Sequence, residues 1–249
     1  MWGVFVSWMN VTANQLRMSG GGATPFENTK SLEFDGVDDY VTMGNPSELQ
    51  ITGALSISFW FKAPSGATGN DDATILKDDI SSNRCFGVWT NDFGTTKVIS
   101  FYIFNSNSIT SVQSSTNYND GNWHHVMCVY IPSTSLKIYV DGVNDGSNTT
   151  SIPASIDNDP ADFTFATSSG SYTFGGNLDE VAIWNTDQTS NLSTIYNSGT
   201  PDDLTSLSPV GYWRNGDGDT YPTIADHGSG GNSGAMTNMS SGDIVTDVP

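Results

Sequence analysis

Basic residues are scarce in this chain of 249 residues, in which 8 lysines and arginines stand against 27 aspartates and glutamates. The formal net charge of -19 argues against nucleic acid as a partner, because a phosphate backbone needs a surface rich in Lys and Arg. Divalent cations are compatible with so acidic a chain, since they neutralise clustered carboxylates. A solvated acidic surface that keeps the protein soluble accounts for most of the aspartates without any ligand.

Long apolar runs are also absent, and no segment approaches the roughly 18 apolar residues of a membrane-spanning helix. The opening MWGVFVSWM is apolar but short. It has no basic region before it and no convincing cleavage site after it, so the pattern does not indicate a signal peptide.

Cysteine is nearly absent, and the spacing of the two that occur, Cys85 and Cys128, is not that of a zinc or redox motif. We expect the strands that carry them to be separated by a third strand at about 98–104. The pattern therefore favours two free, buried thiols over a disulfide and leaves the redox compartment open.

The apolar residues that are present come in short runs of Val, Ile, Phe, Trp and Tyr, separated by Gly, Ser, Asn, Asp and Thr, which is typical of strands and turns. Residues 55–61 alternate as a strand with one core face, residues 97–104 are apolar on both faces, and residues 123–131 and 136–140 form a hairpin. Residues 189–199 predict one helix with Thr189 or Ser190 as N-cap and Gly199 at its exit. These elements predict an all-β, two-sheet antiparallel jelly-roll sandwich with one short helix.

We divide the chain into an apolar arm with a Gly-rich linker, residues 1–30, and one sandwich, residues 31–249, because sandwiches of this length do not need a second domain. The last part of the sandwich, residues 209–249, is expected to be an edge segment.

Four separated segments share a recognisable order and spacing: LEFDGVDDYV (32–41), LSISFWF (55–61), DGNWHHVMCVYIPSTSLKIYVDG (120–142) and GNLDEVAIWN (176–185). Over roughly residues 31–200 they resemble laminin-G-like domains of the concanavalin A-like lectin/glucanase superfamily. In many relatives a segment similar to residues 211–238 precedes the FDG strand, whereas here it follows the helix. It is either a permuted edge strand, which we favour, or the start of a second domain. The carboxy-terminal arrangement also resembles structural proteins of marine bacteriophages.

The resemblance makes glycoside hydrolysis the first activity to consider, because the superfamily includes laminarinase-like enzymes with a Glu-x-Asp-x-x-Glu strand. This chain has only four glutamates, Glu27, Glu33, Glu48 and Glu180, and no two share such a strand. Asp can replace Glu as a glycosidase carboxylate, which weakens the argument. The serine-rich loops contain no nucleophile elbow. We therefore predict that the protein is not an enzyme and has no catalytic residues.

The pair His124-His125 does not indicate a metal site, because adjacent strand residues point to opposite faces and cannot chelate one ion together. We expect His125 to pack with Trp123 and Met127 in a structural role.

A structural calcium ion is implied by the resemblance, since relatives hold one between the FDG turn and the strand equivalent to LDEV. By that resemblance Asp35, Asp38 and Asp179 are the candidate ligands. The alternative is an Asx turn for Asp35 and Asp38 and a cap at the strand entry for Asp179.

A second acidic run follows the spacing of an EF-hand loop but lacks its glycine and flanking helices, so a plain polar turn is expected there. Its residues are Asn215, Asp217, Asp219 and Asp226.

Aromatic residues near loops rich in Asn and Ser are candidates for stacking on sugar rings, and we select Trp89, Tyr102 and Tyr118. The alternative for Trp89 and Tyr102 is packing on the sheet.

These features predict a non-catalytic, lectin-like structural module, a decoration or attachment protein on a virion, within an oligomer or larger assembly. The arm residues Trp2, Phe5 and Trp8 would dock to a neighbouring subunit, because exposed apolar side chains are a liability on a soluble monomer. The alternative is a secreted or cell-surface carbohydrate-binding lectin. The expected location is therefore a virion surface or the extracellular space.

Overall fold

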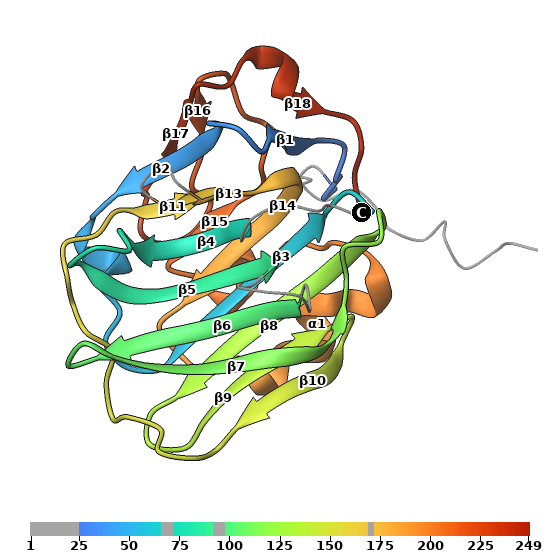
Figure 1. Cartoon of the computed structure of the whole chain (residues 1–249). Helices are drawn as coiled ribbons and strands as arrows, with labels where there is room; N and C mark the ends of the chain where they lie inside the picture. Colours follow the sequence, from blue (N-terminus) through green and yellow to red (C-terminus); the bar gives the residue numbers. More distant parts are fainter. Residues whose placement is uncertain (1–24, 66–71, 92–97, 169–171) are drawn as a thin grey trace, which may run out of the picture.

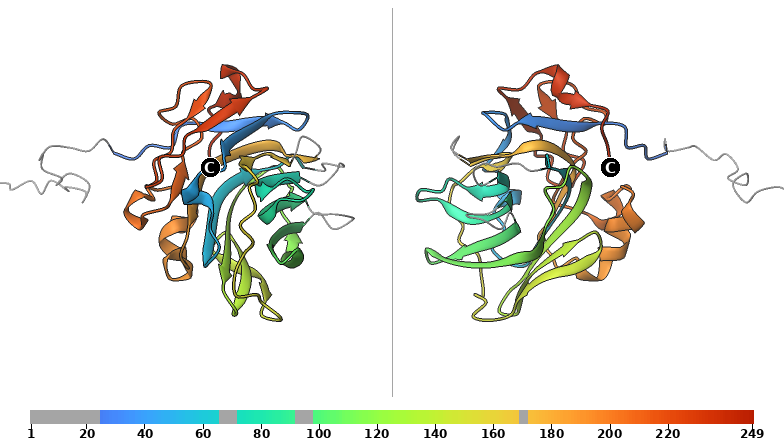
Figure 2. Two further views of the ribbon diagram at one scale, coloured as in Figure 1. Left: turned by 90° about the vertical axis from the view of Figure 1, so that its left-hand side faces the viewer. Right: turned by 45° about the vertical axis from the view of Figure 1, so that its right-hand side comes forward.

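Two antiparallel sheets of eight strands each face one another in this computed structural model, which describes residues 25–65, 72–91, 98–168 and 172–249 (Figures 1 and 2). The prediction of an all-β sandwich is confirmed, and a single short α-helix occurs in the described part of the chain. No helix among the described residues is long and apolar enough to cross a membrane.

Sheet 1 has the strand order β10-β9-β8-β3-β14-β1-β18, with β15 paired to β14. Its strands are β1 (Ser31–Asp35), β3 (Leu55–Lys62), β8 (Trp123–Ile131), β9 (Ser135–Val140), β10 (Val143–Asn148), β14 (Gly175–Trp184), β15 (Gly211–Trp213) and β18 (Ile244–Val245). The predicted hairpin at 123–131 and 136–140 is confirmed as β8 and β9, which pair from Val126 with Val140 to Ile131 with Ser135.

Sheet 2 has the strand order β16-β17-β2-β11-β4-β5-β6-β7. Its strands are β2 (Tyr40–Gly44), β4 (Asp72–Asp78), β5 (Arg84–Asn91), β6 (Val98–Asn105), β7 (Ser108–Asn117), β11 (Phe163–Phe165), β16 (Thr223–Ile224) and β17 (Gly234–Thr237). A small separate sheet consists of β12 (Thr167–Ser168) and β13 (Tyr172–Thr173).

Strand β3 shows how the alternation of the sequence builds the core. Leu55, Ile57, Phe59 and Phe61 point between the sheets and are fully buried. The opposite face of β3 is buried as well, because the segment around α1 (Leu192–Tyr196) covers the outer face of sheet 1. Ile195 packs there with residues of β8 and β14 in a second, smaller core.

The helix begins differently from the prediction. Neither Thr189 nor Ser190 caps α1 with its side chain, because a 3-10 turn, η2 (Thr189–Asn191), precedes the helix. Asp187 accepts a hydrogen bond from the backbone N–H of Thr189 at 2.8 Å and so holds the start of that turn. The other 3-10 turns are η1 (Ser47–Leu49), η3 (Asn197–Gly199), η4 (Thr205–Leu207) and η5 (Ser241–Asp243).

The carboxy-terminal segment contributes to both sheets: β15 pairs with β14, β17 with β2, and β18 with β1. Trp213 on β15 is fully buried between the sheets, with its ring centroid 5.6 Å from that of Phe163 and 5.4 Å from that of Phe165. Its indole N–H donates to the carbonyl of Asn232 at 2.9 Å. Residues 209–249 are therefore part of the sandwich and its core.

Cys85 and Cys128 are free and buried, as predicted, but for a different reason. Cys85 lies on β5 in sheet 2 and Cys128 on β8 in sheet 1, so no strand of one common sheet separates them. Burial raises the pKa of the Cys85 thiol to about 11, which keeps this thiol protonated and unreactive at neutral pH.

Candidate functional site

The outer face of sheet 2, which points away from sheet 1, carries polar side chains at its centre. Alternation along β2 and β11 turns Val41 and Phe163 into the core and leaves Thr42 and Thr164 on the outer face. These two threonines are paired across the strands, so polar groups from distant parts of the sequence lie side by side.

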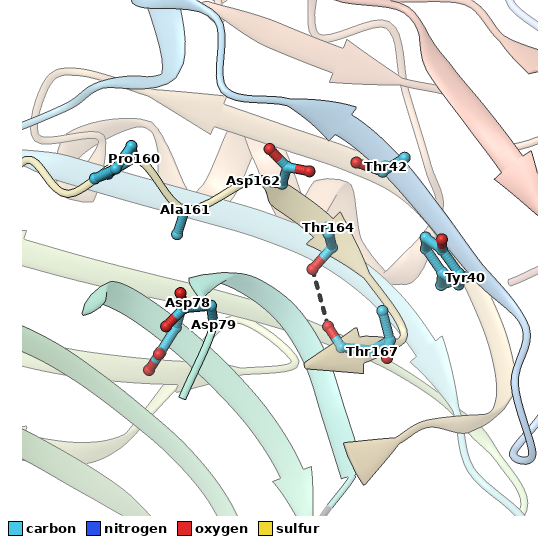
Figure 3. A pocket seen from close by; sticks show the side chains of 9 residues that line it. All are labelled: Tyr40, Thr42, Asp78, Asp79, Pro160, Ala161, Asp162, Thr164 and Thr167. Carbon is cyan, nitrogen blue, oxygen red and sulfur yellow. Dashed lines mark hydrogen bonds between the residues drawn. The ribbon is translucent and has the colours of Figure 1, made fainter. Parts of the chain in front are cut away.

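A hollow of about 560 Å³ opens over this part of the face. Figure 3 shows Tyr40 and Thr42 of β2 on one side, Asp78 and Asp79 on the other, and Thr164 between them. The full lining is Tyr40, Thr42, Asp78, Asp79, Pro160, Ala161, Asp162, Thr164 and Thr167. We call it the first hollow.

One wall of the first hollow is held in place by a buried lysine. The Lys77 ammonium, on a side chain only 1% exposed, donates to Ala161 O at 2.6 Å and to Asn45 Oδ1 at 2.6 Å. Burial lowers the pKa of Lys77, but the surrounding oxygens take the place of water around the cation. The segment containing Pro160, Ala161 and Asp162 is thereby fixed beside β11.

The opposite boundary of the first hollow is a row of three hydrogen-bonded side chains, Asp78, Arg84 and Tyr102, which we call the ridge. Asp78 accepts from Arg84 Nη2 at 3.0 Å and from the Tyr102 hydroxyl at 2.8 Å. Arg84 also lies over the ring of Phe104, with 4.2 Å from its guanidinium carbon to the ring centroid. Burial and the Asp78 carboxylate raise the pKa of Tyr102, so its hydroxyl remains a donor.

Asp79, next along the chain, supplies a permanent negative charge at the rim. Partial burial opposes ionisation, but hydrogen bonds from Asn83 and Ser81 lower the pKa of Asp79 to about 2. Asp162 adds a second, exposed carboxylate on the facing wall.

A second hollow of about 270 Å³ lies on the other side of the ridge. It is lined by Arg84, Trp89, Ser100, Tyr102, Ile109, Ser111 and Gln113. Two of the three predicted sugar-binding residues, Trp89 and Tyr102, therefore line one cavity on the outer face. Their rings are only 2% and 5% exposed, so they contribute more to packing on the sheet than to an open stacking surface.

Tyr118 does not belong to either hollow. Its hydroxyl donates to Asp145 at 2.9 Å, and its ring lies 5.0 Å from that of His124. The sequence prediction also missed Tyr40, Thr42 and Thr164. The signal that identifies the two threonines is a polar residue at an outward position between buried apolar neighbours, as in YVTM and FTF.

The three predicted calcium ligands do not come together. Asp35 pairs with Gly175, four residues before Asp179 on β14, so Asp35 and Asp179 are separated along the strand by roughly 13 Å. Asp35 and Asp38 instead lie near Asp39, with one carboxylate oxygen of each within 4.8 Å of the others. The Asx turn weighed as the alternative is also present, because Asp35 Oδ1 accepts from Val37 N at 2.7 Å.

Asp179 lies at a register shift of β14 beside Glu180, in a buried acidic cluster. Asp179 accepts from Asn28 Nδ2 at 2.9 Å, and Glu180 accepts from the Tyr212 hydroxyl and from Arg214 Nε. Burial and the mutual repulsion of the two carboxyl groups raise the pKa of Asp179, and burial raises the pKa of Glu180 to about 7.

The three aspartates of the EF-hand-like run are hydrogen-bonded in turns, whereas both side-chain polar atoms of the buried Asn215 are without a hydrogen-bond partner among the described residues. Asp217 accepts from the backbone and hydroxyl of Thr29, and Asp219 accepts from Gly216 N and Ala225 N. Asp226 accepts from three backbone N–H groups, those of Tyr212, Gly228 and Asn232.

The two histidines point to opposite faces, as predicted. His124 Nδ1 lies 2.8 Å from Asp141, whereas His125 is fully buried on the outer face of sheet 1, in ring contact with Tyr196. His125 Nε2 lies 2.8 Å from Ser58 Oγ, which resembles a base and nucleophile pair. Ser58 is 1% exposed and His125 is 0% exposed, so this pair offers no surface to a substrate.

The arm residues Trp2, Phe5 and Trp8 lie outside the described residues.

Two facing sheets with a hollowed outer face define a lectin-like sandwich. Residues 35–191 match a laminin-G-type family model, described as the concanavalin A-like lectin/glucanases superfamily. Because this match covers more than half of the chain, the protein belongs to that superfamily. No protein with a curated description matches the sequence.

Solved structures support the same fold. A protein from Bacteroides ovatus ATCC 8483, described provisionally as carbohydrate binding, matches with a TM-score of 0.65 and 16% identity, over 88% of this chain and 60% of the other. The binding domain of Paraclostridial Mosquitocidal Protein 1 matches with a TM-score of 0.51 and 14% identity, over 72% of this chain and 48% of the other. This chain thus spans less than two thirds of either protein, and the likeness concerns the fold.

Proposed function

We propose that the protein is a non-catalytic carbohydrate-binding module whose site is the first hollow on the outer face of sheet 2. The observation that carries the proposal is the lining itself, in which one aromatic ring, three threonines and several carboxylates converge in one fixed cavity. A sugar presents both apolar faces and hydroxyl groups, and such a lining matches both. The provisional description of the Bacteroides ovatus protein as carbohydrate binding supports the same class.

A tryptophan at position 42 tests the location of the site. We expect Thr42→Trp to fill the first hollow and to weaken binding of the glycan selected on an array at least tenfold, which is about 1.4 kcal/mol. Titration calorimetry with the wild-type protein and the variant measures this. Thr149→Trp, at an exposed position outside both hollows, is the matched control and should bind like the wild type. If Thr42→Trp folds normally and keeps full affinity, the site is elsewhere.

We propose in addition that calcium binds at Asp35 and Asp38 with Asp39 in place of Asp179. Three carboxylates this close suit Ca²⁺, which prefers oxygen ligands, and burial together with repulsion from Asp35 raises the pKa of Asp39. When bound, the ion would neutralise the three carboxylates and stabilise the turn that carries them.

Calcium should raise the melting temperature of the chelator-treated wild-type protein, because an ion that binds only the folded state stabilises it. The same addition of calcium should leave the melting temperature of the Asp38→Asn variant unchanged. Thermal melts with chelator and with added calcium measure both. An unchanged wild-type melt contradicts the ion, and an equal response of the two proteins contradicts the ligand set.

The assembly role remains a proposal from the sequence. In this proposed role the module is a decoration or attachment protein on a virion or another extracellular surface. The arm with Trp2, Phe5 and Trp8 docks to a neighbouring subunit. A secreted or cell-surface lectin is the alternative use of the same module.

A further inference from the structure

The two hollows lie on the same face of sheet 2 and are separated only by the ridge. The first opens over β2, β11 and β4, and the second over β5, β6 and β7. Thr164 on β11 and Ser111 on β7 are four strand intervals apart, which is roughly 19 Å at a spacing of about 4.8 Å. A monosaccharide is too small to reach both hollows, whereas a chain lying across the strands is not.

The ridge is fixed in position by its hydrogen bonds. Tyr102 reaches across Gly87 to bond Asp78, and a Cβ atom at Gly87 would lie 2.5 Å from the Tyr102 hydroxyl oxygen. Glycine therefore lets the ring lie directly against the sheet. The charges of Arg84 and Asp78 face each other, so a sugar chain passing over the ridge meets a neutralised pair.

The charges around the first hollow disfavour anions. Asp79 is held ionised and Asp162 is exposed on the opposite wall. Among the described residues that line the two hollows, Arg84 is the only cation, and it is paired with Asp78. Lys77 is not part of either lining, and its buried ammonium is bonded to Ala161 O. With a chain charge of -19, the face repels carboxylate and sulfate groups.

The second hollow is suited to an uncharged sugar. Its lining combines the hydroxyl groups of Ser100 and Ser111 with the amide of Gln113 and the side chain of Ile109, which is 58% exposed. Hydroxyl and amide groups match sugar hydroxyls, and the apolar side chain matches the face of a ring.

Building on the proposed function, we propose that the outer face of sheet 2 binds an uncharged glycan chain laid across the strands. One part of the chain occupies each hollow, a glycosidic linkage passes over the Asp78, Arg84 and Tyr102 ridge, and glycans bearing carboxylate or sulfate groups are rejected.

Chain length is the first test. The wild-type protein is titrated with laminarin, galactomannan and arabinan, and then with oligosaccharides of one to six units cut from whichever binds. We expect affinity to rise at least tenfold between the shortest and the longest fragments, as the second hollow is filled. Thr164→Trp and Ser111→Trp, which block one hollow each, should each reduce the affinity for the longest fragment to near that of the short ones. Affinity independent of length, or loss in only one variant, overturns the two-hollow site.

Charge is the second test. The bound polysaccharide is compared with the same polysaccharide after its primary hydroxyls have been oxidised to carboxylates. We expect the oxidised form to bind the wild-type protein at least tenfold more weakly. Asp162→Lys should narrow this difference several-fold. Asp202→Lys, the same charge change at an exposed position outside both hollows, should not. Equal binding of both polysaccharides, or equal effects of both variants, overturns the charge selection.

These results also separate the inference from the proposed function. If no saccharide binds, the proposed function fails and the inference fails with it. If saccharides bind but the length or charge dependence is absent, the module is a lectin and only the inference is wrong. Melting temperatures equal to that of the wild type show that each variant is folded.

Discussion

Replacing Trp213 by alanine should lower the free energy of unfolding by about 3–5 kcal/mol, the range observed when large aromatic residues are deleted from a core. The Trp213 ring is fully buried between Phe163 and Phe165, and the change would also remove the partner of the Asn232 carbonyl. Urea unfolding followed by fluorescence or circular dichroism measures the loss. Trp213 lies in the carboxy-terminal segment, so a large loss means that this segment holds the sandwich together.

Val143→Ala provides the control for Trp213→Ala. Val143 is 67% exposed, and its truncation should change stability by less than about 0.5 kcal/mol. A loss below about 1 kcal/mol in Trp213→Ala would show instead that the carboxy-terminal segment is an accessory to an already stable sandwich.

The strands of this fold could be predicted because alternation is a local property. Spacing alone predicts a strand at 55–61 and a hairpin at 123–140, and β3, β8 and β9 lie there. The arrangement of strands in space is not local. A third strand is predicted between the strands of Cys85 and Cys128, but the two strands lie in different sheets, because alternation does not indicate which strand pairs with which.

The site was harder to predict for the same reason. Thr42 and Thr164 are neighbours across β2 and β11 although more than 100 residues separate them in the chain. In the sequence each is an ordinary polar residue on a strand, and only the pairing of β2 with β11 brings the two together in the lining of the first hollow. For the predicted calcium ligands the strand pairing is right and the register is wrong. The FDG strand does pair with the LDEV strand, but Gly175 rather than Asp179 lies beside Asp35.

The acidic cluster at Asp179 and Glu180 predicts an unusual pH dependence of stability. Burial raises the pKa of Glu180 from 4.5 to about 7, so the folded state holds this proton more tightly than the unfolded chain. The stability that the proton contributes is complete below pH 4.5 and is lost as the pH rises through 7. This shift corresponds to roughly 3 kcal/mol.

His125 acts in the opposite direction. Burial lowers the pKa of His125 from 6.5 to about 4, so stability is lost as the pH falls from 6.5 towards 4. The two pH windows overlap, so in the wild-type protein the loss from Glu180 and the gain from His125 largely offset each other between about pH 4.5 and pH 6.5.

Glu180→Gln should remove the contribution of Glu180 from this profile, whereas that of Asp179, whose pKa burial also raises, remains. Relative to the wild type, the variant should gain up to roughly 3 kcal/mol between pH 5 and pH 8, because it has no proton at position 180 to lose. In the variant Arg214 keeps only Asp217 as an ion-pair partner, and the stability lost in this way shifts the whole curve without changing its slope. Urea unfolding at several pH values, with chelator present, measures the two slopes. Glu48→Gln, at an exposed position, should follow the wild-type slope. Parallel profiles for Glu180→Gln and the wild type would mean that Glu180 is already ionised at pH 5, and that Arg214 and Tyr212 outweigh its burial.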